Sequence, residues 1–155
     1  MSYVITGLPL EQFQPLFGLD DNALAARGAA RHVVDAKPGS PCRVTLQDAE
    51  PGETVLLLNY EHQPAATPYR SSHAIFVREA AMQTAASTDE LPESLRIRLL
   101  SIRAFNTDGM MVDAEVLRGA ELEPLIRTWF ERPEIAYLHA HNAARGCYAA
   151  RIDRS

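Results

Sequence analysis

The sequence predicts an α+β fold built on one twisted, mostly antiparallel sheet of about six or seven strands. Apolar and polar residues alternate in several short segments, which is the pattern of half-buried strands. Turn-forming residues separate consecutive segments closely enough to join them as hairpins. One main segment, about residues 120–131, carries a helical apolar stripe that could cover one face of the sheet.

Length and composition indicate one globular unit. With 155 residues, we expect residues 1–155 to form a single domain. A net charge of -5, from 15 basic and 20 acidic residues, opposes non-specific binding to nucleic acid or to an anionic membrane, so neither is predicted as a partner. The N-terminus shows no secretory signal, so we expect a cytoplasmic protein in which Cys42 and Cys147 are free thiols, with a Cys42–Cys147 disulfide as the alternative that the sequence leaves open.

The first half of the chain predicts short elements joined by turns. Prolines and glycines interrupt its apolar runs, so the N-terminal helices should be short. Pro51 and Gly52 fit the central positions of a type II turn, where proline fixes φ and glycine accepts a positive φ. The predicted elements are strands at 3–6 and 31–36, short helices within 9–17 and at 23–27, a hairpin of 42–47 with 54–60, and a buried strand at 74–77.

The second half predicts a hairpin of residues 95–106 with 110–117. Its loop ends at Gly109, which should adopt the left-handed conformation. This register would place Arg103 opposite Asp113 on the exposed face of the sheet, where such a pair contributes little to stability. The main helix follows, and Pro133 ends it.

The closing segment Ile135–Ile152, IAYLHAHNAARGCYAARI, predicts another hairpin with its turn at residues 142–146. Residues two apart in a strand share a face. If His141 pairs with Cys147, one face collects Tyr137, His139, His141, Cys147 and Arg151. A register shifted by one residue would separate the histidines from Cys147.

This face has two chemical interpretations and one structural interpretation. Two imidazoles and a thiolate could hold a metal, which makes His139, His141 and Cys147 an alternative metal site. A histidine could instead lower the pKa of Cys147 and create a nucleophile. The structural interpretation is a half-exposed sheet face with ordinary polar side chains and Cys147 as a small buried filler, and a lone His-x-His motif favours it.

The loop at residues 61–72 adds a second group. Its Tyr69 and Arg70 could bind a phosphate or carboxylate, since a guanidinium can donate two parallel hydrogen bonds to such a group. The alternative is a solvated connection shaped by prolines. The candidate ligand-binding residues of the whole chain are Tyr69, Arg70, His73, Tyr137, His139, His141, Cys147 and Arg151.

Standard catalytic signatures are missing from the sequence. It contains no glycine-rich phosphate loop, His-Glu-x-x-His, Gly-x-Ser-x-Gly or Cys-x-x-Cys. No cofactor and no catalytic residue is predicted, and the sequence leaves open whether the chain is an enzyme. The leading prediction is a domain that binds a small ligand, with anions as the suggested class, or a protein partner. The alternatives are the metal protein or enzyme described above and a purely structural or interaction module, and the sheet edges could support a homodimer.

The chain contains a set of ordered motifs: PCRVTL at Pro41–Leu46, PGETVLLLNYEH at Pro51–His62, PYR at Pro68–Arg70, AIFVRE at Ala74–Glu79 and HNAARGCYAAR at His141–Arg151. These motifs resemble a bacterial family known as domain of unknown function 1203. The similarity extends over essentially the whole chain. It implies a free-standing cytoplasmic bacterial domain and supplies no activity.

Overall fold

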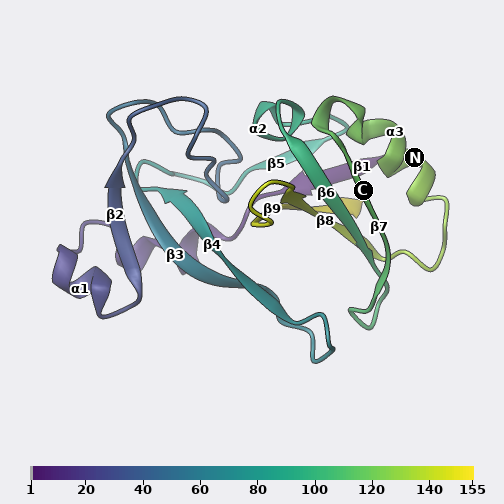
Figure 1. Ribbon diagram of the computed structural model, residues 1–155, viewed down its shortest axis with the longest axis horizontal. Coiled ribbons are helices and arrows are strands. Elements are labelled where there is room, and N and C mark those ends of the chain that lie inside the picture. Colours follow the sequence, from purple (N-terminus) through teal and green to yellow (C-terminus); the bar gives the residue numbers. More distant parts are fainter. Residues whose placement is uncertain (1) are drawn as a thin grey trace.

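The computed structural model describes residues 2–155 and confirms an α+β fold with antiparallel sheets (Figure 1). Within this range nine strands form two sheets, of six and three strands, rather than a single sheet. The six-stranded sheet matches the predicted strand number, and the three-stranded sheet is additional. No helix in the described range is long and apolar enough to cross a membrane.

The six-stranded sheet has the order β5-β1-β9-β8-β6-β7, and the three-stranded sheet the order β2-β3-β4. The strands are β1 Tyr3–Thr6, β2 Ala29–Val33, β3 Thr54–Gln63, β4 Ser71–Arg78, β5 Ala86–Thr88, β6 Leu99–Phe105, β7 Met111–Arg118, β8 Tyr137–Asn142 and β9 Tyr148–Arg154. The helices are α1 Asp21–Ala25, α2 Glu93–Arg96 and α3 Leu122–Trp129, with single 3-10 turns η1 Leu10–Gln12, η2 Gln14–Leu16 and η3 Gly119–Glu121.

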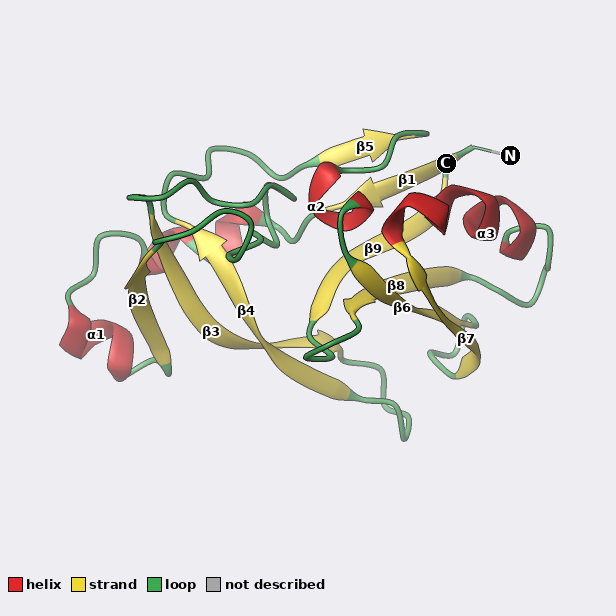
Figure 2. Ribbon diagram, turned by 45° about the horizontal axis from the view of Figure 1, so that its top comes forward, coloured by secondary structure: helices red, strands yellow, loops and turns green. Residues whose placement is uncertain are grey.

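The predicted main helix is confirmed and packs on the six-stranded sheet (Figure 2). Its apolar side chains share one buried cluster with strand residues such as Ile102 and Leu138. Regular α-helix begins at Leu122, because residues 119–121 form a 3-10 turn. A side chain at Gly119 would collide with the carbonyl group of Leu95 in α2. Glycine at this position therefore allows the backbone of α2 to pack closely against the 3-10 turn.

The predicted hairpin of residues 42–47 with 54–60 is wrong. Strand β3 pairs with β2 and β4, and residues 42–47 make only isolated bridges at their edges. One physical reason is Leu46, whose φ of 56° is incompatible with an extended strand. The segment instead buries Cys42 and Val44 in a second apolar cluster with Ile75 and Val77 of β4.

The hairpin of β6 and β7 is confirmed, with Gly109 at a positive φ of 81°, but its register differs from the prediction. Residues 93–96 form α2, and a β-bulge at the loop end shifts the pairing. Arg103 therefore lies opposite Ala114 and not Asp113. Asp113 forms an ion pair of 2.6 Å with Arg132, so Arg103 is not part of the predicted cross-strand pair.

The two sheets lie side by side. In Figures 1 and 2 the sheet of β2, β3 and β4 stands beside the six-stranded sheet, and α2 and α3 lie with the latter. Ring contacts between β3 and β8 show that the sheets meet at their side chains. The junction is where the candidate site forms.

Candidate metal centre

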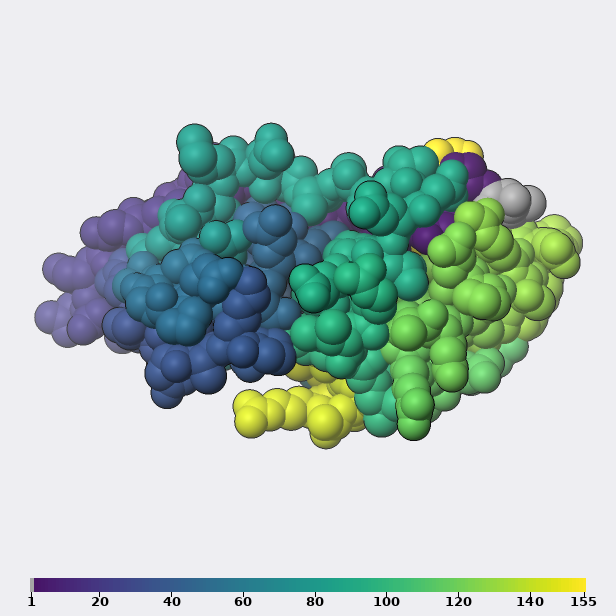
Figure 3. All heavy atoms as spheres, turned by 90° about the horizontal axis from the view of Figure 1, so that it is seen from above, coloured from purple at the N-terminus to yellow at the C-terminus, as the bar shows by residue number. Residues whose placement is uncertain are grey.

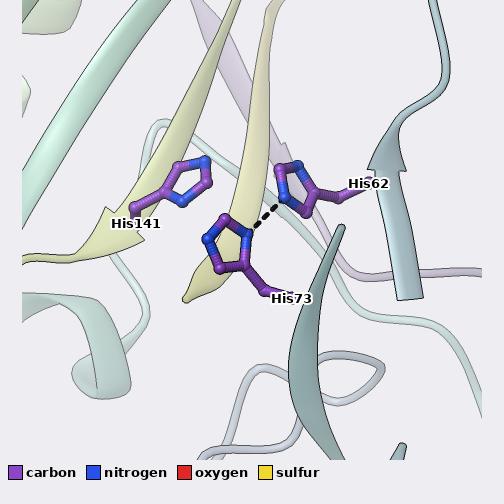
Figure 4. A group of neighbouring side chains, drawn as sticks. All are labelled: His62, His73 and His141. Atoms are coloured by element: carbon purple, nitrogen blue, oxygen red, sulfur yellow. Dashed lines mark hydrogen bonds between the residues drawn. The ribbon is translucent and has the colours of Figure 1, made fainter. Parts of the chain in front are cut away.

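Four of the five histidines of the chain gather at the junction of the two sheets. His62 comes from β3, His73 from β4, and His139 and His141 from β8. The ring centroids of His62, His73 and His141 are 4.8 to 5.4 Å apart. Figure 4 shows these three rings converging from three strands. The fifth histidine, His32, is exposed on the edge strand β2.

A β-bulge contributes to the position of His62. Strand β3 pairs Tyr60 with His73 but Gln63 with Ser71, so β3 carries one extra residue between these pairs. A bulge turns the side chains of its own residues away from strict alternation. His62 consequently stacks against His73 with an interplanar angle of 20°. The ring of His62 also stacks against that of Tyr148, with centroids 5.0 Å apart.

A second bulge changes the face of the closing hairpin. Ala140 pairs with Ala150 and His141 with Tyr148, so Ala149 is the extra residue of β9. The predicted pairing of His141 with Cys147 is therefore wrong. Tyr148 takes the place beside the histidines, and its ring lies 5.2 Å from His139 and 5.8 Å from His141.

The hairpin turn fixes the proton of His141. Its Nδ1 lies 2.8 Å from the carbonyl oxygen of Gly146, and a carbonyl only accepts, so the Nδ1–H donates. In the neutral ring the lone pair then resides on Nε2. That Nε2 is buried and has no hydrogen-bond partner in the described chain. A backbone carbonyl that orients one ring nitrogen while the other stays free is the usual support of a metal-bound histidine.

His62 and His73 share one proton. Nε2 of His62 and Nδ1 of His73 are 2.6 Å apart, and one must donate to the other (Figure 4). The Nδ1 of His62 is buried without a partner. Buried polar atoms of native proteins are rarely left unpaired, and a bound ion is one common explanation for those that are. The cluster therefore holds buried ring nitrogens, Nδ1 of His62 and Nε2 of His141, that no group of the described chain satisfies.

Burial keeps these histidines neutral. It lowers the pKa of His62 to about 4, helped by His73 and Arg103. Burial likewise lowers the pKa of His139 to about 2 and of His141 to about 3, and lowers the pKa of His73. The neighbouring charge that recurs is the guanidinium of Arg103, which disfavours protonation of all four rings. Neutral imidazoles are the form that binds metals.

Three histidines have the spacing of a ligand set. His62, His73 and His141 each offer one nitrogen, and these nitrogens lie within 4.8 Å of one another. His139 lies outside this set, and its ring packs 5.0 Å from Phe105 and 5.3 Å from Tyr137. We therefore assign His62, His73 and His141 as the candidate ligands and His139 as part of the wall behind them.

Comparison with known proteins identifies the family to which the chain belongs. The family described as protein of unknown function (DUF1203) matches residues 39–154. The chain belongs to this family. The matched range of this DUF1203 protein contains all four clustered histidines and Arg103. No curated protein and no solved structure shows significant similarity to the chain.

The structure brings only part of the predicted site of this DUF1203 protein together. His73, His139 and His141 join the cluster, and Tyr137 borders it, with its hydroxyl accepting a 2.9 Å bond from Gln63. Arg151 lies opposite His139, but its guanidinium stacks on Tyr137 and binds Asp153 at 2.8 and 2.9 Å.

Tyr69, Arg70 and Cys147 lie apart from the ligand set. The first two are exposed on the β3–β4 loop, and Arg70 pairs with Glu61 at 3.1 Å. The thiol of Cys147 instead accepts a 3.1 Å bond from Arg43. Figure 3 shows the tip of its hairpin, in yellow, projecting from the surface.

His62, Arg103 and Tyr148 are the residues that the sequence prediction missed. His62 was expected in a loop, although alternation could have been followed through Gln63 to extend the strand. A polar surface cleft elsewhere, lined by Lys37, Glu50, Arg78 and Glu93 among others, includes none of the histidines. Since it brings no metal-ligand set together, it is a weaker candidate than the histidine cluster.

Proposed function

We propose that the protein binds a divalent transition-metal ion through His62, His73 and His141. The observation that carries this proposal is the convergence of three neutral, largely buried imidazoles from three strands, with the Nε2 of His141 left unbonded. A structural role alone gives no reason to bury lone pairs without donors, because each costs about 1–3 kcal/mol.

The distances between the ring nitrogens of His62, His73 and His141 indicate that the side chains would move slightly when an ion binds. Imidazole nitrogens bind Zn²⁺ at about 2.0–2.1 Å, so two ligands of one tetrahedral ion lie about 3.3 Å apart. The contact of 2.6 Å between His62 and His73 is shorter than this value, and the limit of 4.8 Å for the whole set is longer. Side-chain rotations could bring the three nitrogens to a common distance from an ion.

The ligand types favour zinc, copper, nickel or iron over calcium or magnesium, which prefer oxygen. Three protein ligands also leave at least one coordination position for water or another molecule. Structural zinc sites are usually closed by four protein ligands, whereas catalytic sites keep a position open. The proposal therefore includes an exchangeable ligand on the ion. An open position of this kind is compatible with an enzymatic role.

Metal binding is tested by titrating metal-free protein with Zn²⁺ and Co²⁺, followed by calorimetry and by the visible spectrum of cobalt. We expect one ion per chain, and loss of tight binding in the variants His73→Ala and His141→Ala. The matched control is His32→Ala, which removes the one histidine outside the cluster. Equal affinity in all three variants would contradict the proposal.

The remaining predictions from the sequence stay predictions. A bacterial, cytoplasmic protein with free thiols is compatible with metal-binding histidines, since zinc and thiols coexist in reducing compartments. A homodimer through sheet edges would bury Val33 on β2 or Val116 on β7, which are 59% and 60% exposed. Sedimentation of the purified chain would measure the oligomeric state.

A further inference from the structure

We infer that the metal site takes a small oxyanion as its second ligand, held jointly by the ion and by the guanidinium of Arg103. This inference rests on the proposed metal site and names the chemical class of what occupies its open position. Carboxylate, carbonate and phosphate each carry two or more oxygen atoms. One oxygen can bind the metal while another accepts hydrogen bonds from the guanidinium.

The first argument is charge. Three neutral imidazoles leave a divalent ion with both of its charges, unlike ligand sets that contain a carboxylate or thiolate. Among residues 2–155, no carboxylate forms a hydrogen bond or ion pair with His62, His73 or His141. A buried divalent ion without a counter-charge is costly, so an anion in the open position would be favoured over neutral water.

The second argument is the position of Arg103. On β6 it lies directly opposite His139, and Ser101 on the same strand lies opposite His141, so all four side chains share one face of the sheet. Its Nε lies 3.4 Å from the hydroxyl oxygen of Ser101, the residue paired with His141, so the guanidinium lies on the side of β6 that faces the histidines. The guanidinium therefore stands beside the place where the ion would bind.

The third argument is that Arg103 has no acidic partner in the described chain. Its one hydrogen bond runs from Nε to the Ser101 hydroxyl at 3.4 Å, which is long. Burial lowers the pKa of this guanidinium, a sign that it is partly desolvated without compensation. The neighbouring Arg151 differs, because Asp153 already satisfies it at 2.8 and 2.9 Å. Within residues 2–155, Arg103 is thus a cation near the site without an acidic partner.

The surroundings limit the anion to a small one. His62 is enclosed between the rings of His73 and Tyr148, at 4.8 and 5.0 Å. Phe105 and Tyr137 close the wall behind His139, at 5.0 and 5.3 Å. This packing favours a ligand of a few heavy atoms, or the acidic end of a larger molecule that reaches in from the half-buried His73.

The test uses full-length protein loaded with Co²⁺, whose visible spectrum reports a change of ligand at the ion. Acetate, bicarbonate and inorganic phosphate are titrated separately, with perchlorate as a weakly coordinating anion. We expect a saturable spectral change with at least one of the three oxyanions and none with perchlorate. Comparing the three separates carboxylate, carbonate and phosphate ligands.

The variant Arg103→Gln should weaken oxyanion binding by about 10- to 100-fold, as expected for the loss of a charge-assisted contact. Arg103→Lys should be intermediate, since it keeps the charge but not the fork. Arg118→Gln, at an exposed arginine at the end of β7, is the matched control and should bind as the parent does. In oxyanion-free buffer, Arg103→Gln should also bind Co²⁺ at least as tightly as the parent, because a repelling charge is removed.

The outcomes separate the two proposals. One bound cobalt with no response to any oxyanion, or an unchanged oxyanion affinity in Arg103→Gln, would overturn the inference and leave the metal site standing. Absence of cobalt binding in the parent protein would overturn both. A weaker cobalt affinity in Arg103→Gln without any anion would indicate that Arg103 only supports the fold.

Discussion

The Nδ1–H of His141 donates to the carbonyl oxygen of Gly146, 2.8 Å away, and this bond commits the lone pair of the ring to Nε2. Gly146 belongs to the turn of the closing hairpin, so the turn determines how the ring presents itself to the other histidines. Its φ of 78° lies in the left-handed region, which glycine adopts at low cost. The conformation of one turn residue thus supports the chemistry of a neighbouring strand.

Replacement of this glycine should damage the site more than the fold. Gly146→Ala places a side chain in open space, so only the backbone conformation is disfavoured, by about 1–2 kcal/mol. If the turn relaxes, the carbonyl moves and the His141 ring loses its orientation. We expect metal affinity to fall by about 10- to 100-fold, the usual effect of losing such support.

Gly28→Ala is the matched control for this variant. Gly28 has a φ of 70°, also faces open space, and lies after α1, away from the histidines. Both variants should lose similar stability in urea denaturation, and only Gly146→Ala should lose metal affinity in calorimetry. Equal metal affinity in the two variants would show that the Gly146 carbonyl does not position His141.

Metal removal should lower thermal stability. An ion that binds only the folded chain adds about 2.7 kcal/mol at a concentration 100 times its Kd. For a chain of 155 residues this corresponds to a Tm shift of roughly 5–10 °C. A chelator should therefore lower the Tm of zinc-loaded protein by this amount and leave His141→Ala unaffected. A chelator effect of the same size in that variant would place the stabilising metal elsewhere.

Local patterns in the sequence predicted most elements but not their registers. Alternation identified β6 and β7 and the closing hairpin, and the apolar stripe identified α3. The bulges are single extra residues, such as Ala149, and nothing in a period of two distinguishes an extra residue from its neighbours. One such residue exchanges Cys147 for Tyr148 opposite His141, which changes the chemistry predicted for the whole face.

No local sequence pattern predicted that the two sheets contact each other. His73, His139 and His141 were predicted as candidates because of their residue types and spacing, and each of them lies in the cluster. His62 completes the ligand set only because β3 continues through a bulge and approaches β8. Such an approach depends on side-chain packing between distant segments, which periodicity within one segment does not describe.

The thiol of Cys147 should be dispensable for metal binding. It accepts a bond of 3.1 Å from the buried guanidinium of Arg43, which also donates to the backbone oxygens of Tyr148 and Pro41. Cys147→Ala should leave the zinc affinity unchanged. It should lower the free energy of unfolding by about 1–3 kcal/mol, because Arg43 loses an acceptor.

Calorimetry and urea denaturation of Cys147→Ala measure the two effects separately. The variant His73→Ala provides the contrast, since it should lose tight metal binding. A large loss of zinc affinity in Cys147→Ala would instead make the thiol a ligand, as the alternative set of His139, His141 and Cys147 requires.

Acid should destabilise the metal-free protein at a pH where carboxylates are still ionised. Burial lowers the pKa of His139 to about 2 and of His141 to about 3, whereas unfolding restores values near 6.5. Below pH 6.5 the unfolded chain therefore holds more protons than the folded chain, so the free energy of unfolding falls as pH falls. The stability contributed by the neutral rings is fully present above pH 6.5. Each ring can contribute a slope of up to about 1.4 kcal/mol per pH unit.

Urea denaturation of metal-free protein at pH 7.5, 6.5 and 5.5 would measure this slope. The variant His139→Phe should reduce it, because the new ring cannot be protonated and fits the aromatic wall of Phe105, Tyr137 and Tyr148. A slope in His139→Phe equal to that of the parent would mean that His139 is charged in the folded chain, contrary to its burial.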